Sequence, residues 1–290
     1  MSTHEWGSYE PVGYFSGRIE DAAAREEGRH KPLKLPPPEV LTPHDQKEKA
    51  FHPGYAGWPV GKLLYFPLRA RAEPLRLIMH YAGMNYTLRT IELSEWPEIK
   101  PTTPKGQVPC FVIDEQEEMM PETADIAMYL AQTSGKDGLW PAASADQSAA
   151  EAMFVASNTS PLSDLNPLLN WFPKEEAQSK IKPSVDAALK ALGKFKLKGD
   201  YFGGKVPHYG EFGLWHNVDL LLKVEPNALS KLGKDWAARY ERIADNRDVK
   251  AFLQCRPKAG TGSVGKAGSM MATMPLDGDS KPELPTYKTE

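Results

Sequence analysis

The pattern of hydrophobic and polar positions changes period twice within the first recognisably structured stretch. Residues 62–66 (KLLYF) form a short apolar run that predicts a buried strand. Residues 73–82 then carry apolar positions at helical spacing, with Glu73-Pro74 in the first turn and Gly83 as the C-cap. Residues 86–93 (YTLRTIEL) alternate as a second strand does. This pattern predicts a β-α-β unit.

A second pattern follows directly in the chain. Residues 106–109 (GQVP) place a proline at the start of the apolar run 110–113, where a strand tolerates it. Residues 114–118 read as a hairpin connection to a short strand at Met119-Met120, and Thr123 begins a helix with an apolar face. The order β-α-β and then β-β-α is typical of a thioredoxin-like sheet.

Beyond a Gly-rich linker the chain contains only helical signals. The run 209–222 is apolar on more than one face, as expected for the central helix of an all-α domain. Further helices are expected at 149–157, 174–192, 236–243 and 249–253. We therefore expect an α+β chain with a thioredoxin-like domain at 61–133 and an all-α domain at 142–257.

The two ends of the chain have a different composition. Residues 1–60 contain eight prolines and scattered aromatic residues, and residues 258–290 are rich in Gly, Ser, Met and Pro without periodicity. One interpretation is a pair of floppy extensions. The other is that both arms lie extended on neighbouring proteins of a large assembly, since neither can bury enough of its own surface to fold alone. A cytoskeletal or ciliary lattice would suit such arms, although no residue selects it.

Composition and charge narrow the class of protein. The net charge is −3 and no basic stripe carries interleaved aromatic residues, which argues against nucleic acid as a partner. The two cysteines, Cys110 and Cys255, are far apart and indicate neither a disulfide framework nor a metal site. No apolar run approaches the length of a membrane span, and the first residues lack a signal peptide. We expect a cytoplasmic chain without a bound metal.

Four sequence motifs between residues 63 and 131 resemble those of the cytosolic glutathione transferases: LLYFPLRARAEPLRLIMHYAG, WPEIKP, GQVPCFV and PETADIAMYLA. They occur in that family's order and at about its spacing, and the likeness is strongest to the tyrosine-type classes sigma, pi and mu. It continues more weakly to about Arg256 and does not cover residues 1–60 or the last thirty or so. The resemblance implies an enzyme that uses glutathione as co-substrate, and a two-fold dimer.

The resemblance assigns the chemistry to Tyr65, whose hydroxyl would donate to the glutathione sulfur and favour the thiolate. A charge-assisted hydrogen bond contributes roughly 1.5–3 kcal/mol, enough to lower the pKa of a thiol by one to two units. Without the resemblance, a tyrosine in this strand would be read as core. Cys110 is a rival nucleophile, but it follows a proline within an apolar strand and is interpreted as packing.

The same resemblance implies a binding site for the tripeptide. Val108 would pair its backbone with the cysteinyl residue beside a cis Val108–Pro109 bond, while Thr123 and Glu122 would hold the γ-glutamyl carboxylate and ammonium. Read alone, these residues suggest a trans proline, a helix cap and a surface acid. The predicted glutathione-binding residues are Arg69, Trp96, Lys100, Gln107, Val108, Pro109, Glu122 and Thr123.

Two positions depart from the family pattern. His208 stands where the Ser or Thr of a capping box is usual, whereas Glu211 keeps the acid of that box. Ala156 aligns loosely with an aspartate that commonly reaches glutathione across the dimer. We expect a glutathione transferase acting on a small electrophile. The alternative is a structural or scaffold subunit with a vestigial site, anchored through 1–60 and 258–290.

Overall fold

The computed structural model describes residues 60–113, 118–260 and 264–274. These residues divide into two compact units, which we call the sheet unit (60–66 and 86–126) and the helical unit (67–85 and 127–274). Residues 1–59, which contain nearly all of the expected N-terminal arm, lie outside the described residues. The same holds for the predicted connection at 114–117 and for the tail from 275.

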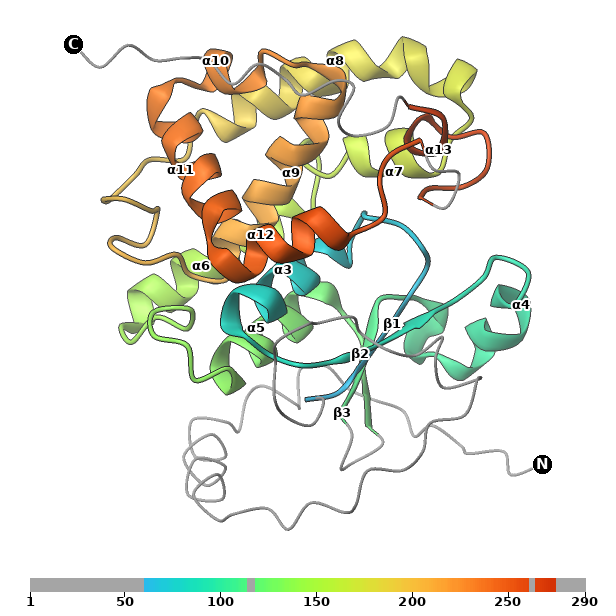
Figure 1. Ribbon diagram of the computed structural model, residues 1–290, viewed down its shortest axis with the longest axis horizontal. Coiled ribbons are helices and arrows are strands. Elements are labelled where there is room, and N and C mark those ends of the chain that lie inside the picture. The colour runs from blue at the N-terminus through green and yellow to red at the C-terminus, as the bar shows by residue number, and fades with distance from the viewer. Residues whose placement is uncertain (1–59, 114–117, 261–263, 275–290) are drawn as a thin grey trace. The chain divides into compact units, whose positions relative to one another are not determined.

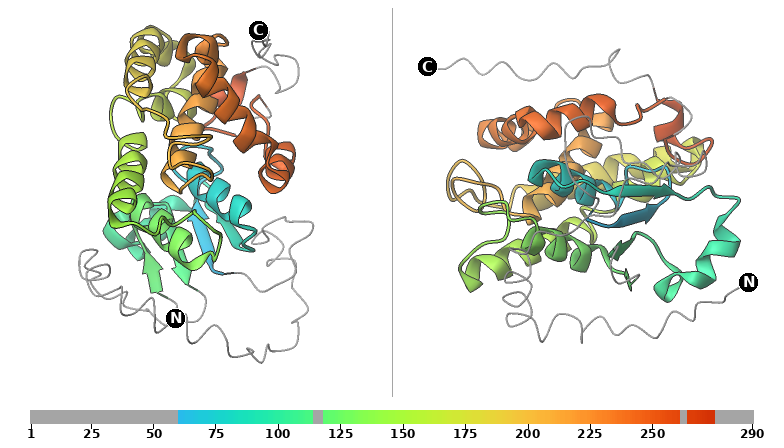
Figure 2. Two further views of the ribbon diagram at one scale, coloured as in Figure 1. Left: turned by 90° about the vertical axis from the view of Figure 1, so that its left-hand side faces the viewer. Right: turned by 60° about the horizontal axis from the view of Figure 1, so that its bottom comes forward.

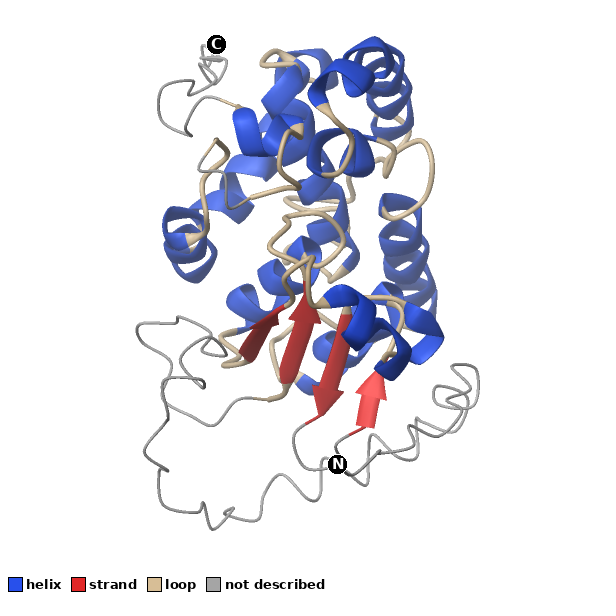
Figure 3. Cartoon of the chain, turned by 90° about the vertical axis from the view of Figure 1, so that its right-hand side faces the viewer, coloured by secondary structure: helices blue, strands red, loops and turns tan. Residues whose placement is uncertain are grey.

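The sheet unit contains four strands in the order β2-β1-β3-β4, visible in Figure 3. They are β1 (Lys62–Tyr65), β2 (Thr87–Thr90), β3 (Cys110–Ile113) and β4 (Glu118–Met120). β1 runs parallel to β2 and antiparallel to β3, with Leu63 opposite both Leu88 and Phe111. The parallel pair requires a crossover, which the chain makes through α3 (Glu73–Ala82).

The predicted elements of this stretch are confirmed, because their local signals are strong. Pro74 occupies the first turn of α3, and Gly83 ends the helix in the left-handed conformation at φ 70°. β3 has the predicted bounds, whereas β2 is shorter than predicted. Residues 96–106 add α4 (Trp96–Ile99) and the 3₁₀ turns η2 (Lys100–Thr102) and η3 (Pro104–Gly106), and α5 (Thr123–Thr133) follows β4.

The helical unit is built around α9 (Gly210–Val224), in which thirteen of fifteen residues are buried. Its leucines and valines form one cluster with Leu165, Leu192 and Trp236 from other helices. Figure 1 shows the arrangement of α6 (Ser144–Ser157), α7 (Leu165–Asn170), α8 (Lys174–Leu192), α10 (Ala228–Leu232), α11 (Lys234–Asp245) and α12 (Arg247–Cys255).

The chain beyond α12 folds back onto the helical unit. Residues 257–260 and 264–274, which we call the C-terminal strap, end in the short helix α13 (Met270–Thr273) beside α7 (Figure 2). Ala259, Val264 and Met271 are at most 2% exposed and belong to the same hydrophobic cluster as α9. For these residues the structure differs from the expected extended tail, because spaced apolar side chains without a period still fill core positions.

Candidate functional site

Tyr65 is the last residue of β1 and lies on the buried face of that strand together with Leu63. Its side chain is 5% exposed, and its carbonyl accepts a hydrogen bond of 2.9 Å from the backbone N–H of Ile91. The ring contacts Phe66 at a centroid distance of 5.9 Å, and Phe66 contacts Trp96 edge-on at 5.1 Å. The sheet and this aromatic series therefore fix the strand end that carries the phenol.

Val108, just before β3, has backbone groups that are available for hydrogen bonding. The Val108–Pro109 peptide bond is cis, as the sequence interpretation favoured. Val108 is half-buried, and its N–H and C=O have no hydrogen-bond partner among the described residues. Two residues further on, Cys110 joins the sheet opposite Leu64. An extended peptide could pair with the open Val108 groups without displacing a strand.

The start of α5 combines a helix N-terminus with an exposed acid. Thr123 is the first residue of α5 and is 8% exposed; its N–H and hydroxyl have no partner among the described residues. Glu122 has a positive φ of 64° and forms an ion pair of 2.9 Å with Lys105, which is itself at φ 56°. This pair ties the loop before β3 to the first turn of α5 and brings Val108 and Thr123 into one neighbourhood.

Lys105 was missed by the sequence interpretation. Its signal was a cation directly before the GQVP string, but an exposed lysine is usually solvated and carries little weight alone. Both side chains of the Lys105–Glu122 pair are nearly half exposed, so solvent screens the attraction between them.

Trp96 and Lys100 lie one helical turn apart, as predicted. Trp96 opens α4, and its carbonyl accepts the backbone N–H of Lys100. Trp96 is half-buried against Phe66, while Lys100 and Gln107 are exposed. The sheet unit thus contains all the predicted site residues except Arg69: Tyr65, Trp96, Lys100, Gln107, Val108, Pro109, Glu122 and Thr123.

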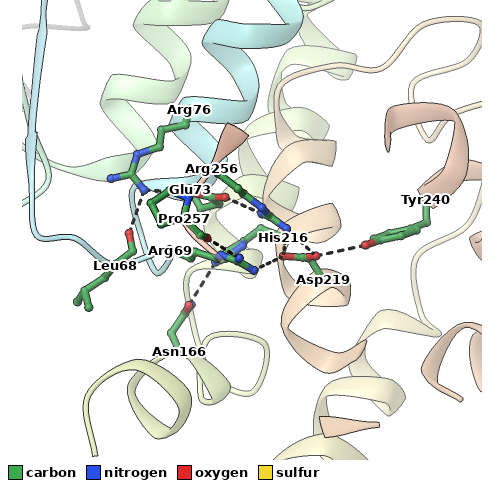
Figure 4. A network of polar contacts seen from close by, with 10 residues as sticks. All are labelled: Leu68, Arg69, Glu73, Arg76, Asn166, His216, Asp219, Tyr240, Arg256 and Pro257. Carbon is green, nitrogen blue, oxygen red and sulfur yellow. Dashed lines mark hydrogen bonds and ion pairs between the residues drawn. The ribbon is translucent and has the colours of Figure 1, made fainter. Parts of the chain in front are cut away.

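Arg69 is the exception, because it belongs to the helical unit, and its contact with glutathione stays a prediction. Its side chain is 3% exposed in the helical unit and donates from Nη2 to the carbonyl of Pro257 at 2.7 Å. Its Nη1 lies 4.0 Å from Asp219 (Figure 4). The guanidinium therefore belongs to a buried group of charged side chains.

The buried charge cluster consists of Arg69, Glu73, Arg76, Asp219, Tyr240 and Arg256. Arg256 bridges two acids, donating to Glu73 at 2.7 Å and to both oxygens of Asp219 at 3.0 and 3.1 Å. Arg76 pairs with Glu73 at 3.1 Å, and Tyr240 donates to Asp219 at 3.3 Å. Burial alone would raise the pKa of Asp219, but Arg256 outweighs it and holds that pKa below its usual range.

Two further titratable groups singled out in the sequence, Cys110 and Glu211, are buried. Burial raises the pKa of the Cys110 thiol to about 12, so this cysteine is protonated and poorly nucleophilic at neutral pH. Glu211 accepts hydrogen bonds from the N–H groups of Gly203 and His208, which preserves the acid half of the capping box. Among the described residues no group of His, Cys, Asp or Glu is arranged to hold a metal ion.

None of the helices found in the described part of the chain combines the length and apolar character needed to span a bilayer.

Part of the chain is similar in sequence to known proteins. The family described as "Glutathione S-transferase, N-terminal domain" matches residues 71–138. Chicken hematopoietic prostaglandin D synthase is 31% identical over 207 residues, covering 69% of this chain and 98% of that protein. Probable glutathione S-transferase 7 of Caenorhabditis elegans is 37% identical, with 68% and 96% covered.

Solved structures show the same architecture. The rat hPGDS complex with a quinoline matches with a TM-score of 0.58 and 24% identity over 69% of this chain and 98% of that one. The Pi-class glutathione S-transferase of Onchocerca volvulus matches with a TM-score of 0.61 and 19% identity, covering 72% and 99%. A thioredoxin-like sheet with an open peptide edge and a helical unit defines the class of this protein. The chain belongs to the glutathione S-transferase family.

Proposed function

We propose that this chain binds glutathione in the sheet unit and activates it as a thiolate that attacks a small electrophile. The observation that supports this most is the Lys105–Glu122 pair, which joins the open backbone of Val108 to the start of α5. A peptide edge beside a helix N-terminus offers main-chain pairing and an anion site within one tripeptide's length. Glutathione has both a cysteinyl main chain and a γ-glutamyl carboxylate.

The remaining contacts follow from the charge of each group. Glu122 accepts from the α-ammonium of glutathione, and the N–H and hydroxyl of Thr123 donate to the adjacent carboxylate. At the other end of the tripeptide, the indole N–H of Trp96 and the ammonium of Lys100 hold the glycyl carboxylate, with Gln107 as a neutral amide contact. These contacts fix glutathione by its main chain and its ends, and leave the sulfur free to react.

Tyr65 acts on the sulfur itself. Its O–H donates to the thiolate and stabilises the charged form relative to the thiol, which lowers the pKa of the bound thiol. The thiolate then forms a bond to the electrophilic carbon while the leaving group departs with the electron pair of the broken bond. Tyr65 remains protonated throughout, so it is a hydrogen-bond donor and not a base.

The substitution Tyr65→Phe tests this role. We expect glutathione to bind nearly as before, while the pKa of the bound thiol rises by roughly one to two units, because one charge-assisted hydrogen bond is lost. Ultraviolet absorbance of the thiolate against pH measures it. Tyr86→Phe is the control, since Tyr86 is equally buried in the sheet unit but lies outside the proposed site.

An unchanged thiol pKa in Tyr65→Phe would contradict the assignment. Turnover should be assayed with a generic aryl halide first. Two relatives are named hematopoietic prostaglandin D synthase, so prostaglandin D synthesis is the second activity to assay.

A further inference from the structure

The loop that follows Tyr65 and Phe66 is held by the far end of the chain. Pro67 accepts a hydrogen bond through its carbonyl from the N–H of Gly265 at 3.3 Å. Two residues later, Nη2 of Arg69 donates to the carbonyl of Pro257 at 2.7 Å. Both contacts reach the C-terminal strap, and both lie within the helical unit.

The junction between α12 and the strap adds a third attachment. Arg256 immediately precedes the strap and pairs with Glu73, the first residue of α3, at 2.7 Å. The loop 67–72 is thus bound at its first residue, at its third, and at the helix that ends it (Figure 4 shows the Arg69 and Arg256 contacts).

The strap itself is anchored to the rest of the helical unit. The N–H of Lys266 donates to the carbonyl of Asn170 at 2.7 Å, and the N–H of Lys174 donates to the carbonyl of Gly268 at 3.0 Å. Ser269 is fully buried and caps α13, and Met271 is fully buried in the core. A strap fixed in this way can restrain the loop it touches.

We infer that the C-terminal strap is a positioning element for the thiolate site: it holds loop 67–72 and thereby fixes the orientation of Tyr65, two residues before that loop. The sequence resemblance to the family ends at about Arg256, so the strap lies beyond the part of the chain that resembles the family. The catalytic consequence rests on the proposed function. The restraint of the loop does not.

Two glycines of the strap provide a matched test. Gly265 has φ +85°, and an added Cβ would lie 2.6 Å from Oγ of Ser269 and 3.2 Å from Cβ of Met271. Gly268 has φ +80°, and an added Cβ would meet nothing within 4 Å. Both substitutions, Gly265→Ala and Gly268→Ala, place an alanine in the left-handed backbone region and have that cost in common. Only Gly265→Ala also creates a steric clash, with Ser269 and Met271.

Hydrogen exchange of the full-length chain measures the restraint. We expect amide exchange in residues 68–72 to be roughly tenfold faster in Gly265→Ala than in Gly268→Ala, because the loop loses its anchor. Met271→Ala is the second variant, since it loosens the strap from its core side, and it should accelerate the same amides. Exchange in 68–72 that is equal in Gly265→Ala and Gly268→Ala would overturn the inference.

The pH titration of bound glutathione tests the positioning of Tyr65. In Gly265→Ala the pKa of the bound thiol should shift toward that of Tyr65→Phe, with kcat falling more than KM rises. A loosened loop with an unchanged thiol pKa would show that the strap is structural only and would overturn its positioning role. If the wild-type chain itself shows no bound thiolate, the proposed function fails, and the exchange experiment still decides whether the strap restrains the loop.

Discussion

Asp219→Asn should destabilise the helical unit strongly, because the buried charge cluster loses one of its two acids. Three guanidiniums, those of Arg69, Arg76 and Arg256, pair with Glu73 and Asp219 in this cluster. The substitution removes the negative charge and replaces one of the two oxygens that accept from Nη2 of Arg256 with an amide donor. Arg256, whose side chain is only 8% exposed, then keeps Glu73 as an anionic partner but loses the charge of Asp219.

The size of the effect follows from burial. Removing one partner of a buried ion pair costs about 3–5 kcal/mol, since the other charge stays desolvated without compensation. For a domain of this size, that corresponds to a fall in Tm of roughly 6–20 °C. Asp146→Asn is the matched control, because Asp146 pairs with Lys198 at 2.8 Å on the surface and should hardly change Tm.

Thermal unfolding of the full-length chain at several pH values is the assay. Arg256 keeps the pKa of Asp219 below its usual range despite burial, so the stabilisation by this group is present above pH 4 and is lost as pH falls below that. The difference in Tm between wild type and Asp219→Asn should therefore shrink in acid. A loss at neutral pH no larger than that of Asp146→Asn would refute the reasoning.

Three further predictions follow. Gly210→Ala should lower stability by about 1–3 kcal/mol in urea unfolding, because the new Cβ would lie 2.3 Å from the carbonyl oxygen of Ala150; Gly193→Ala, at φ −60° with no contact under 3.4 Å, should be neutral or slightly stabilising. Lys105→Met should tighten glutathione binding roughly 1.5- to 5-fold by calorimetry, because Glu122 is released for the ammonium; weaker binding would assign Lys105 to a carboxylate of glutathione. The purified chain should have twice its 32.2 kDa mass at micromolar concentration, and a clean monomer would exclude the expected dimer.

The sequence predicted elements whose signals are local and repeated. The helix at 174–192 has the bounds expected from its apolar period, and it continues through Pro183. α7, α10 and α13 have six, five and four residues, which is too short for a helical period to be visible. Their conformation depends on tertiary packing, which no local pattern encodes.

The candidate site likewise contains features that depend on local sequence and contacts that depend on residues distant in the chain. The cis Val108–Pro109 bond and the helix start at Thr123 could be predicted because each depends on backbone conformation within a few residues. The role of Arg69 depends on Pro257, 188 residues away in the chain, so no local pattern distinguished a buried cation from one available to a ligand. Lys105 likewise gained its meaning only from Glu122, 17 residues later.

The way the C-terminal strap is attached has an evolutionary consequence. Its contacts with Pro67, Asn170 and Lys174 use main-chain groups, which every residue type except proline can supply. The constrained side chains are chiefly the glycines at 265 and 268 and the buried residues at 259, 264, 269 and 271. Homologues of the strap should therefore diverge in sequence while keeping glycine or small and apolar residues at these positions.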